Sequence, residues 1–109
     1  MTQRVAKIES IIQQVTARTL TEFLERDAAK VTVTRVDAAP DLRNATIWIG
    51  ILGEGPQKDK LWKRVEATQN GLQIALAKHM ETKFVPRLII KLDTGGEYAA
   101  EIDRLLKGL

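Results

Sequence analysis

Lysine and arginine side chains between residues 30 and 92 have the most distinctive chemistry in this chain. This middle part holds eleven basic and six acidic residues, whereas residues 1–29 are balanced and residues 93–109 carry a net charge of −2. A local excess of cations is what phosphate binding requires, because released counterions drive the affinity. The same excess also occurs on ordinary solvated surfaces. Charge alone therefore leaves open both a phosphate-binding face and a merely solvated one.

Residues suited to catalysis are sparse. Ser10 is the only serine, His79 is the only histidine, and there is no cysteine. Catalysis requires a positioned nucleophile, base or metal, and no such constellation of residues is evident in the sequence. The glycine-containing loops match neither the phosphate-binding loop nor the dinucleotide fingerprint. We therefore expect no enzymatic activity, no catalytic residues, no metal site and no cofactor.

Length and hydropathy place the chain among ordinary folded proteins. With 109 residues, of which 44% are hydrophobic, we expect one domain over residues 1–109 with a modest core. No apolar run approaches the roughly 20 residues that a bilayer requires, and the N-terminus lacks a signal-peptide core. The absence of cysteine fits a reducing compartment. We expect a cytoplasmic protein without a membrane association.

The first half of the chain predicts a helix followed by two strands. A long amphipathic helix is predicted over Thr2–Asp27, whose apolar residues recur at helical spacing. Val31–Val36 is rich in β-branched residues and is predicted to be a strand. Ala45–Leu52 follows the breaker Pro40-Asp41 as a second strand with a period of two. This period assigns Ala45, Ile47, Ile49 and Ile51 to the core face and Thr46, Trp48 and Gly50 to the opposite face.

The second half predicts a long basic helix that begins near Lys58 and ends near Lys83, since Pro86 cannot continue it. Unbroken, it would be roughly 37 Å long, about the width of a whole domain of this length. We therefore expect an interruption between Ala67 and Leu72, near Asn70-Gly71, where the backbone tolerates special angles. A third strand is predicted over Arg87–Leu92 and a last helix over Glu97–Lys107.

This order of elements predicts an α+β architecture. The two N-terminal strands have a connection short enough for an antiparallel hairpin. The third strand arrives through a helical crossover, which usually joins parallel strands. The expected result is a three-stranded mixed sheet with helices packed on one face.

The residues that follow this order resemble the ribosome-binding factor A family. The similarity covers nearly the whole chain. Its motifs are mostly structural and individually weak, and it is their order and spacing together that make the resemblance specific. The residues that carry it are Arg4-Val5-Ala6, Val31–Asp37 leading through Asp41-Leu42-Arg43-Asn44-Ala45, Phe84-Val85-Pro86-Arg87-Leu88, and Asp93 with the turn at Thr94.

The resemblance implies a type II K-homology (KH)-like domain with the order α-β-β-α(kinked)-β-α. In that family an Ala-x-Gly kink replaces the Gly-x-x-Gly loop of other KH domains. Here Ala67 and Gly71 are spaced differently from that pattern, and the one literal Gly-x-x-Gly, Gly50–Gly53, lies at the end of an apolar strand.

The resemblance also implies a function in biogenesis of the small (30S) ribosomal subunit. Its members bind 16S rRNA or its precursor and assist maturation without chemistry of their own. The expected partners are the small subunit and its rRNA, with a monomer off the ribosome. The alternative is a protein-interaction module whose basic surface is incidental. The candidate RNA contacts are Arg35, Arg43, Lys60, Lys63, Arg64, Asn70, Gly71, Lys78, Lys83 and Arg87.

Three other features of the sequence each allow two interpretations. Trp48 could stack on a base, or pack against a helix or the edge of the sheet. Asn70-Gly71 could present backbone amides to phosphate or be a helix irregularity. His79 could touch phosphate or lie partly buried on a helix surface.

Overall fold

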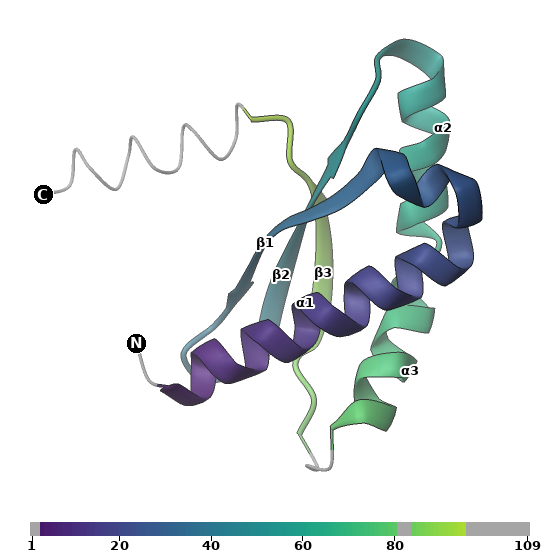
Figure 1. The fold of residues 1–109 in the computed structure, drawn as a ribbon. Helices are drawn as coiled ribbons and strands as arrows, with labels where there is room; N and C mark the ends of the chain where they lie inside the picture. Colours follow the sequence, from purple (N-terminus) through teal and green to yellow (C-terminus); the bar gives the residue numbers. More distant parts are fainter. Residues whose placement is uncertain (1–2, 81–83, 96–109) are drawn as a thin grey trace, which may run out of the picture.

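The computed structural model describes residues 3–80 and 84–95 (Figure 1). The predicted order of helices and strands is confirmed within these ranges, and the helix expected over Glu97–Lys107 lies outside them. The elements are α1 (Gln3–Leu24), the 3-10 helix η1 (Glu25–Lys30), β1 (Val31–Ala38), β2 (Asn44–Ile51), α2 (Gly55–Glu66), α3 (Gln69–His79) and β3 (Arg87–Leu92).

The sheet has the order β1-β2-β3, which places the third strand beside the hairpin, next to β2, as predicted. β1 pairs with β2 in antiparallel fashion, with Val36 opposite Ile47. β2 pairs with β3 in parallel, with Ile47 opposite Ile90. The parallel pairing follows from the crossover through α2 and α3, because a helical connection returns the chain to the same end of the sheet.

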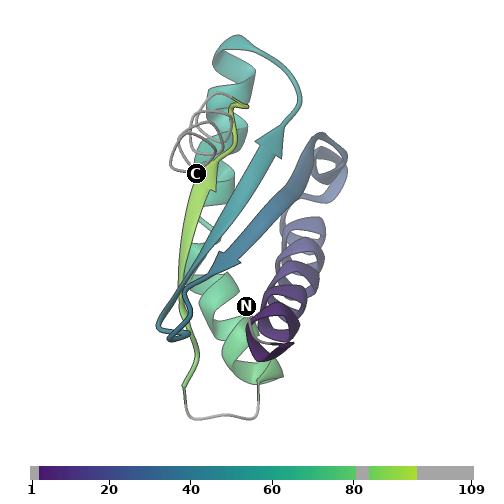
Figure 2. The same cartoon turned by 90° about the vertical axis from the view of Figure 1, so that its left-hand side faces the viewer.

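The helices lie on one side of the sheet, and the core fills the space between the two layers (Figure 2). Ile47 and Ile49 have no exposed surface, and Leu88 of β3 is 1% exposed. Ala45 and Ile51 are also buried, so the period of two correctly assigned the inward face of β2. Leu72 and Leu76 of α3 and Val65 of α2 complete the core from the helical layer.

Helix α1 ends at Leu24, three residues before the predicted end at Asp27. Glu25 adopts a positive φ of 53°, which interrupts the α-helix, and the chain continues from this residue as η1. Leu24, which is 2% exposed, belongs to the buried face of α1, whereas Phe23 is 51% exposed. Glu9 fixes α1 to the sheet, because its Oε2 accepts a hydrogen bond from the Ala38 N–H at 2.9 Å.

The interruption of the basic helix lies at Ala67 and Thr68, between α2 and α3. This position falls within the predicted interval. Asn70 and Gly71 instead belong to the first turn of α3, so the expectation of a break at that pair was wrong. The buried Thr68 hydroxyl donates to the Val65 carbonyl at 2.6 Å, and the Thr68 N–H bonds to the same oxygen at 3.0 Å. This local bonding competes with the regular helical pattern and accounts for the break.

Helix α3 ends at His79, so the expected end near Lys83 was also wrong. Met80 is already extended, with φ −91° and ψ 132°. Stacked layers lie about 10 Å apart, and an extended residue covers about 3.3 Å against about 1.5 Å in a helix. The chain therefore leaves the helix at Met80, because β3, which begins at Arg87, lies in the other layer.

Candidate functional site

The structure separates the predicted contacts into groups at opposite ends of the sheet. Arg43 directly precedes β2, and its carbonyl accepts a hydrogen bond from the N–H of Arg87 at 2.9 Å. At the other end of β2 the chain turns through Gly53 into α2, which carries Lys60 and Arg64. The eight residues of β2 separate the two ends by roughly 26 Å at about 3.3 Å per residue.

The first group, called here the junction group, consists of Arg43, Asn70, Gly71 and Arg87. Asn70 and Arg87 line a hollow of about 330 Å³ beside the break between α2 and α3. Gly71 follows Asn70 in the chain and is exposed, and a Cβ added there would meet no atom within 4 Å. The junction group thus combines two arginines with an exposed amide side chain at the start of a helix.

Two glutamines hold the junction group in place. The side-chain amide of Gln73 donates to the Pro86 carbonyl and accepts from the Leu88 N–H, each at 2.9 Å. Gln69 donates to the Leu88 carbonyl, also at 2.9 Å. Both glutamines line the same hollow as Asn70 and Arg87. The start of β3 is therefore fixed to the first turns of α3 by hydrogen bonds as well as by the core.

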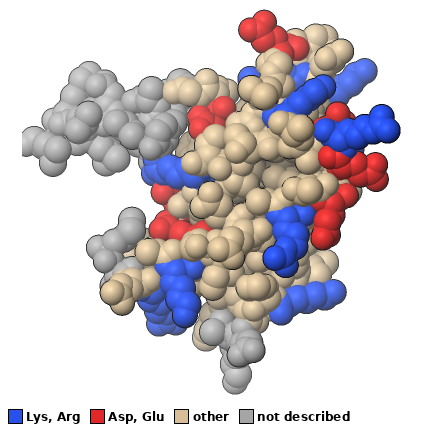
Figure 3. Space-filling view, in the orientation of Figure 1, with Lys and Arg blue, Asp and Glu red and all other residues tan. Residues whose placement is uncertain are grey.

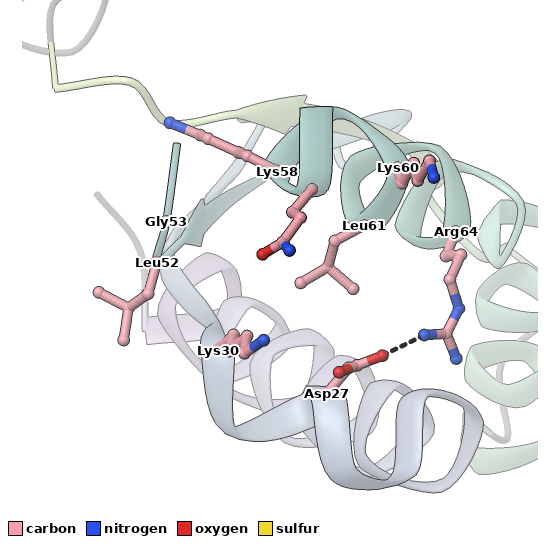
Figure 4. Close-up of a pocket in the computed structure, with 9 residues that line it drawn as sticks. Asp27, Lys30, Leu52, Gly53, Lys58, Lys60, Leu61 and Arg64 are labelled. Atoms are coloured by element: carbon pink, nitrogen blue, oxygen red, sulfur yellow. Dashed lines mark hydrogen bonds and ion pairs between the residues drawn. The ribbon is translucent and has the colours of Figure 1, made fainter. Parts of the chain in front are cut away.

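The second group surrounds a larger hollow of about 620 Å³ between η1 and α2, called here the η1–α2 hollow (Figure 4). Its charged side chains come from both elements, and Arg64 of α2 forms an ion pair with Asp27 of η1 across it. Leu61 contributes an apolar wall. The lining residues are Asp27, Lys30, Leu52, Gly53, Gln57, Lys58, Lys60, Leu61 and Arg64.

Two predicted contacts in and near β1 are paired with acids. Arg35 forms an ion pair with Asp37 on the sheet face away from the helices, with Nε 2.8 Å from Oδ1. The Nε of Arg43 is 3.8 Å from the Oδ2 of Asp41. Because both side chains are exposed, this ion pair contributes little to the stability of the fold. Figure 3 shows acidic side chains interleaved with basic ones on the right of the molecule, and the densest basic group near the top, over α2.

The remaining predicted contacts flank the break. Lys63 of α2 and Lys78 in the last turn of α3 are exposed, and neither lines the hollows described above. Lys83 lies outside the described residues. Lys30 and Lys58 were not among the predicted contacts, although both line the η1–α2 hollow. Lys58 could have been found from the basic stretch that it begins, whereas Lys30 is brought to α2 only by folding.

Trp48 lies on the face of the sheet opposite the helices and is 6% exposed. The Nζ of Lys91, its neighbour on β3, is 5.5 Å from the centre of the ring. The ring is thus mostly buried, which disfavours base stacking, but it lies on the central strand and packs against neither a described helix nor the edge of the sheet. His79 is exposed at the end of α3.

Over residues 3–80 and 84–95, no group of three or more acidic, histidine or cysteine side chains is arranged to hold a metal ion. None of the helices in these two ranges has the length and hydropathy needed to cross a membrane.

Sequence comparison decides the family. Residues 4–106 match the family model described as "Ribosome-binding factor A". The chain belongs to the ribosome-binding factor A family. Among relatives in this family, the protein of Rhodopirellula baltica is 29% identical over 105 residues, covering 95% of this chain and 77% of its own. That of Thermomicrobium roseum is 32% identical over 77 residues, covering 71% of this chain and 60% of its own.

Solved structures of ribosome-binding factor A share the fold. The solution structure of the putative ribosome-binding factor A of Thermotoga maritima has a TM-score of 0.68 at 22% identity, over 82% of this chain and 86% of that one. The crystal structure from Thermus thermophilus has a TM-score of 0.67 at 17% identity, over 81% and 93%. These likenesses confirm the predicted KH-like α+β fold with its interrupted helix.

Proposed function

We propose that this protein binds the small (30S) ribosomal subunit through 16S rRNA or its precursor and assists its maturation without catalysing a reaction. The observation that carries the proposal is the family match over residues 4–106. A homology model of the Thermus thermophilus relative, fitted into a map of a 30S complex with ribosome-binding factor A, has a TM-score of 0.59 to this chain. We further propose that the protein acts in the cytoplasm and is monomeric off the ribosome.

The arrangement of the basic side chains supports RNA as the direct partner. Lys63 and Lys78 are exposed on the two helices that flank the break, so each helix offers a cation to RNA phosphates. Arg87 and Asn70 line the hollow beside the break, where an arginine and an amide can both donate to phosphate oxygens. Contacts of this kind position a nucleic acid without reading its sequence.

The proposal is tested by co-sedimentation of the protein with immature small subunits over a range of salt concentrations. The double variant Lys63→Glu/Lys78→Glu should bind more weakly at low salt and show a flatter salt dependence, because fewer counterions are released when two phosphate-binding cations are removed. The matched control is Lys7→Glu/Arg18→Glu, which makes the same change of charge at exposed positions of α1.

Binding by the double variant that equals that of the parent, with the same salt slope, would remove these helices from the interface. Binding that is insensitive to salt in the parent would instead favour the protein-interaction module, because an apolar interface does not release counterions. Failure of the parent to sediment with immature subunits would refute the proposed function itself.

A further inference from the structure

The η1–α2 hollow gathers more positive charge than any single element of the sequence indicates. Lys30, Lys58, Lys60 and Arg64 line it, and of the described residues in its lining Asp27 alone is acidic. Because Asp27 is already paired with Arg64, the lining retains a net charge of +3 (Figure 4). The neighbouring acid, Asp93, lines a separate adjoining hollow that Lys58 and Leu52 also border.

The fold fixes the backbone at Lys30 and the guanidinium of Arg64 before any ligand arrives. The carbonyl of Lys30 accepts a hydrogen bond from the Leu52 N–H at 2.8 Å, which ties the end of η1 to the end of β2. The ion pair with Asp27 orients the guanidinium of Arg64. A guanidinium has five N–H donors, so Arg64 retains donors for a second anion. Leu61, which is 7% exposed, anchors α2 beneath the charged rim.

We propose that the η1–α2 hollow is a second binding site for RNA phosphates, in which Lys30, Lys58, Lys60 and Arg64 hold the backbone of the polynucleotide. This inference rests on the proposed function. The lysine end of the site is separate from the arginines of the junction group, because Lys30 bonds to Leu52 after β2 whereas Arg87 bonds to Arg43 before it, roughly 26 Å away along the strand. Within the described part of the chain no aromatic residue lines the hollow, so it grips phosphates and does not stack bases.

A polynucleotide fits these observations better than a small anion or an acidic peptide. A hollow of about 620 Å³ with four cations along its walls is much larger than one phosphate group and suits several phosphates in a row. Of the apolar residues described in its lining, Leu61 is committed to the core and Leu52 is 72% exposed at the rim. These two leucines therefore form no enclosed pocket for a peptide side chain, whereas backbone phosphates require only the cations.

The test measures binding of a fluorescein-labelled oligouridine by fluorescence anisotropy at several salt concentrations. The variant Lys30→Gln/Lys58→Gln should bind more weakly. Its plot of log affinity against log salt should be shallower, with the magnitude of the slope smaller by about 0.7 for each phosphate that is no longer neutralised. Oligoadenosine should show the same reduction, because phosphate contacts carry no sequence information. When Lys30→Gln/Lys58→Gln is combined with Arg87→Gln, the losses of binding free energy should add, since these residues lie far apart.

The matched control is Arg4→Gln/Lys7→Gln, which removes the same charge from the N-terminal end of α1. Lys7 lies about 17 residues before the end of α1 at Leu24, which at about 1.5 Å of rise per residue places it roughly 26 Å from η1. The control should leave the salt slope unchanged. A urea midpoint equal to that of the parent confirms that each variant is folded, as expected for side chains that are exposed or, at Lys58, half-buried.

The other outcomes each overturn the second site. An unchanged slope for Lys30→Gln/Lys58→Gln would do so, while reduced subunit binding by Lys63→Glu/Lys78→Glu would leave the proposed function standing. An unchanged RNA slope together with abolished binding of labelled oligoglutamate would reassign the hollow to acidic peptides. An equal reduction in the Arg4→Gln/Lys7→Gln control would attribute the effect to net charge and also refute the site.

Discussion

Gln73 of α3 bonds to Leu88 on the side of β3 where the described residues provide no further strand. Its side-chain oxygen accepts the Leu88 N–H at 2.9 Å, and its amide donates to the Pro86 carbonyl. β3 is an edge strand, and an unpaired edge is open to pairing with other chains. Gln69 completes the arrangement by donating to the Leu88 carbonyl. The start of this edge is thus blocked by two side chains of the adjacent helix.

We predict that Gln73→Leu lowers the free energy of unfolding by about 1–3 kcal/mol, because the partly buried Leu88 N–H and Pro86 carbonyl both lose their partner. Urea denaturation measures the change. Gln13→Leu, at an exposed position of α1, is the control and should change stability by less than about 0.5 kcal/mol. Equal effects of the two substitutions would contradict the role assigned to Gln73.

Ile47→Ala and Leu88→Ala should each lower the free energy of unfolding by about 2–5 kcal/mol, the usual cost of emptying a core position. Ile47 has no exposed surface and Leu88 is 1% exposed. Ile89→Ala changes the neighbouring residue of β3, which is 37% exposed on the opposite face, and should cost less. A larger loss of stability for Ile89→Ala would mean that the inward face of β3 is wrongly assigned.

Gly71→Ala should raise the free energy of unfolding by about 0.5–1 kcal/mol, because alanine loses less backbone entropy than glycine in a helix. The added Cβ would meet no atom within 4 Å, and the residue lies in the first turn of α3. Thermal and urea unfolding provide the measurement. Destabilisation would show that the break between α2 and α3 does depend on this glycine.

Thr68→Val keeps the shape of the side chain but removes the hydroxyl that donates to the Val65 carbonyl. We expect a decrease in stability of about 0.5–1.5 kcal/mol for this buried hydrogen bond. Thr21→Val is a closely matched control, since the Thr21 hydroxyl donates to the Ala17 carbonyl at 2.8 Å on the exposed surface of α1. If the two changes proved equally mild, the hydroxyl of Thr68 would not be what stabilises the break.

Local patterns determined most of the secondary structure. β3 matches its predicted range Arg87–Leu92, and β2 is shifted by one residue from Ala45–Leu52 to Asn44–Ile51. The alternation along β2 also identified its buried face, because successive side chains of a strand point to opposite sides. These features depend on residues close together in the chain, which is why a single sequence is sufficient to predict them.

The ends of the helices were predicted less well than the strands. The sequence placed the break at Asn70-Gly71 from backbone tolerance, but the buried hydroxyl of Thr68 sets it earlier. α3 stops at His79 although Pro86, the obvious terminator, lies seven residues further on. At Thr68 a local hydrogen bond of a buried hydroxyl outweighs the backbone tolerance of Asn70-Gly71, and at His79 the packing of the helix against the sheet overrides the local preference.

The candidate site divides in the same way. The sequence by itself determined that the basic excess lies in residues 30–92 and that Lys60 and Arg64 belong to one helix. Only the tertiary structure brought Lys30 and Asp27 opposite α2, and Arg43 beside Arg87. Composition fixes how many charges a chain carries. Whether they add up at one place or are neutralised by an acid depends on distances across the fold, and coulombic interactions are decided by those distances.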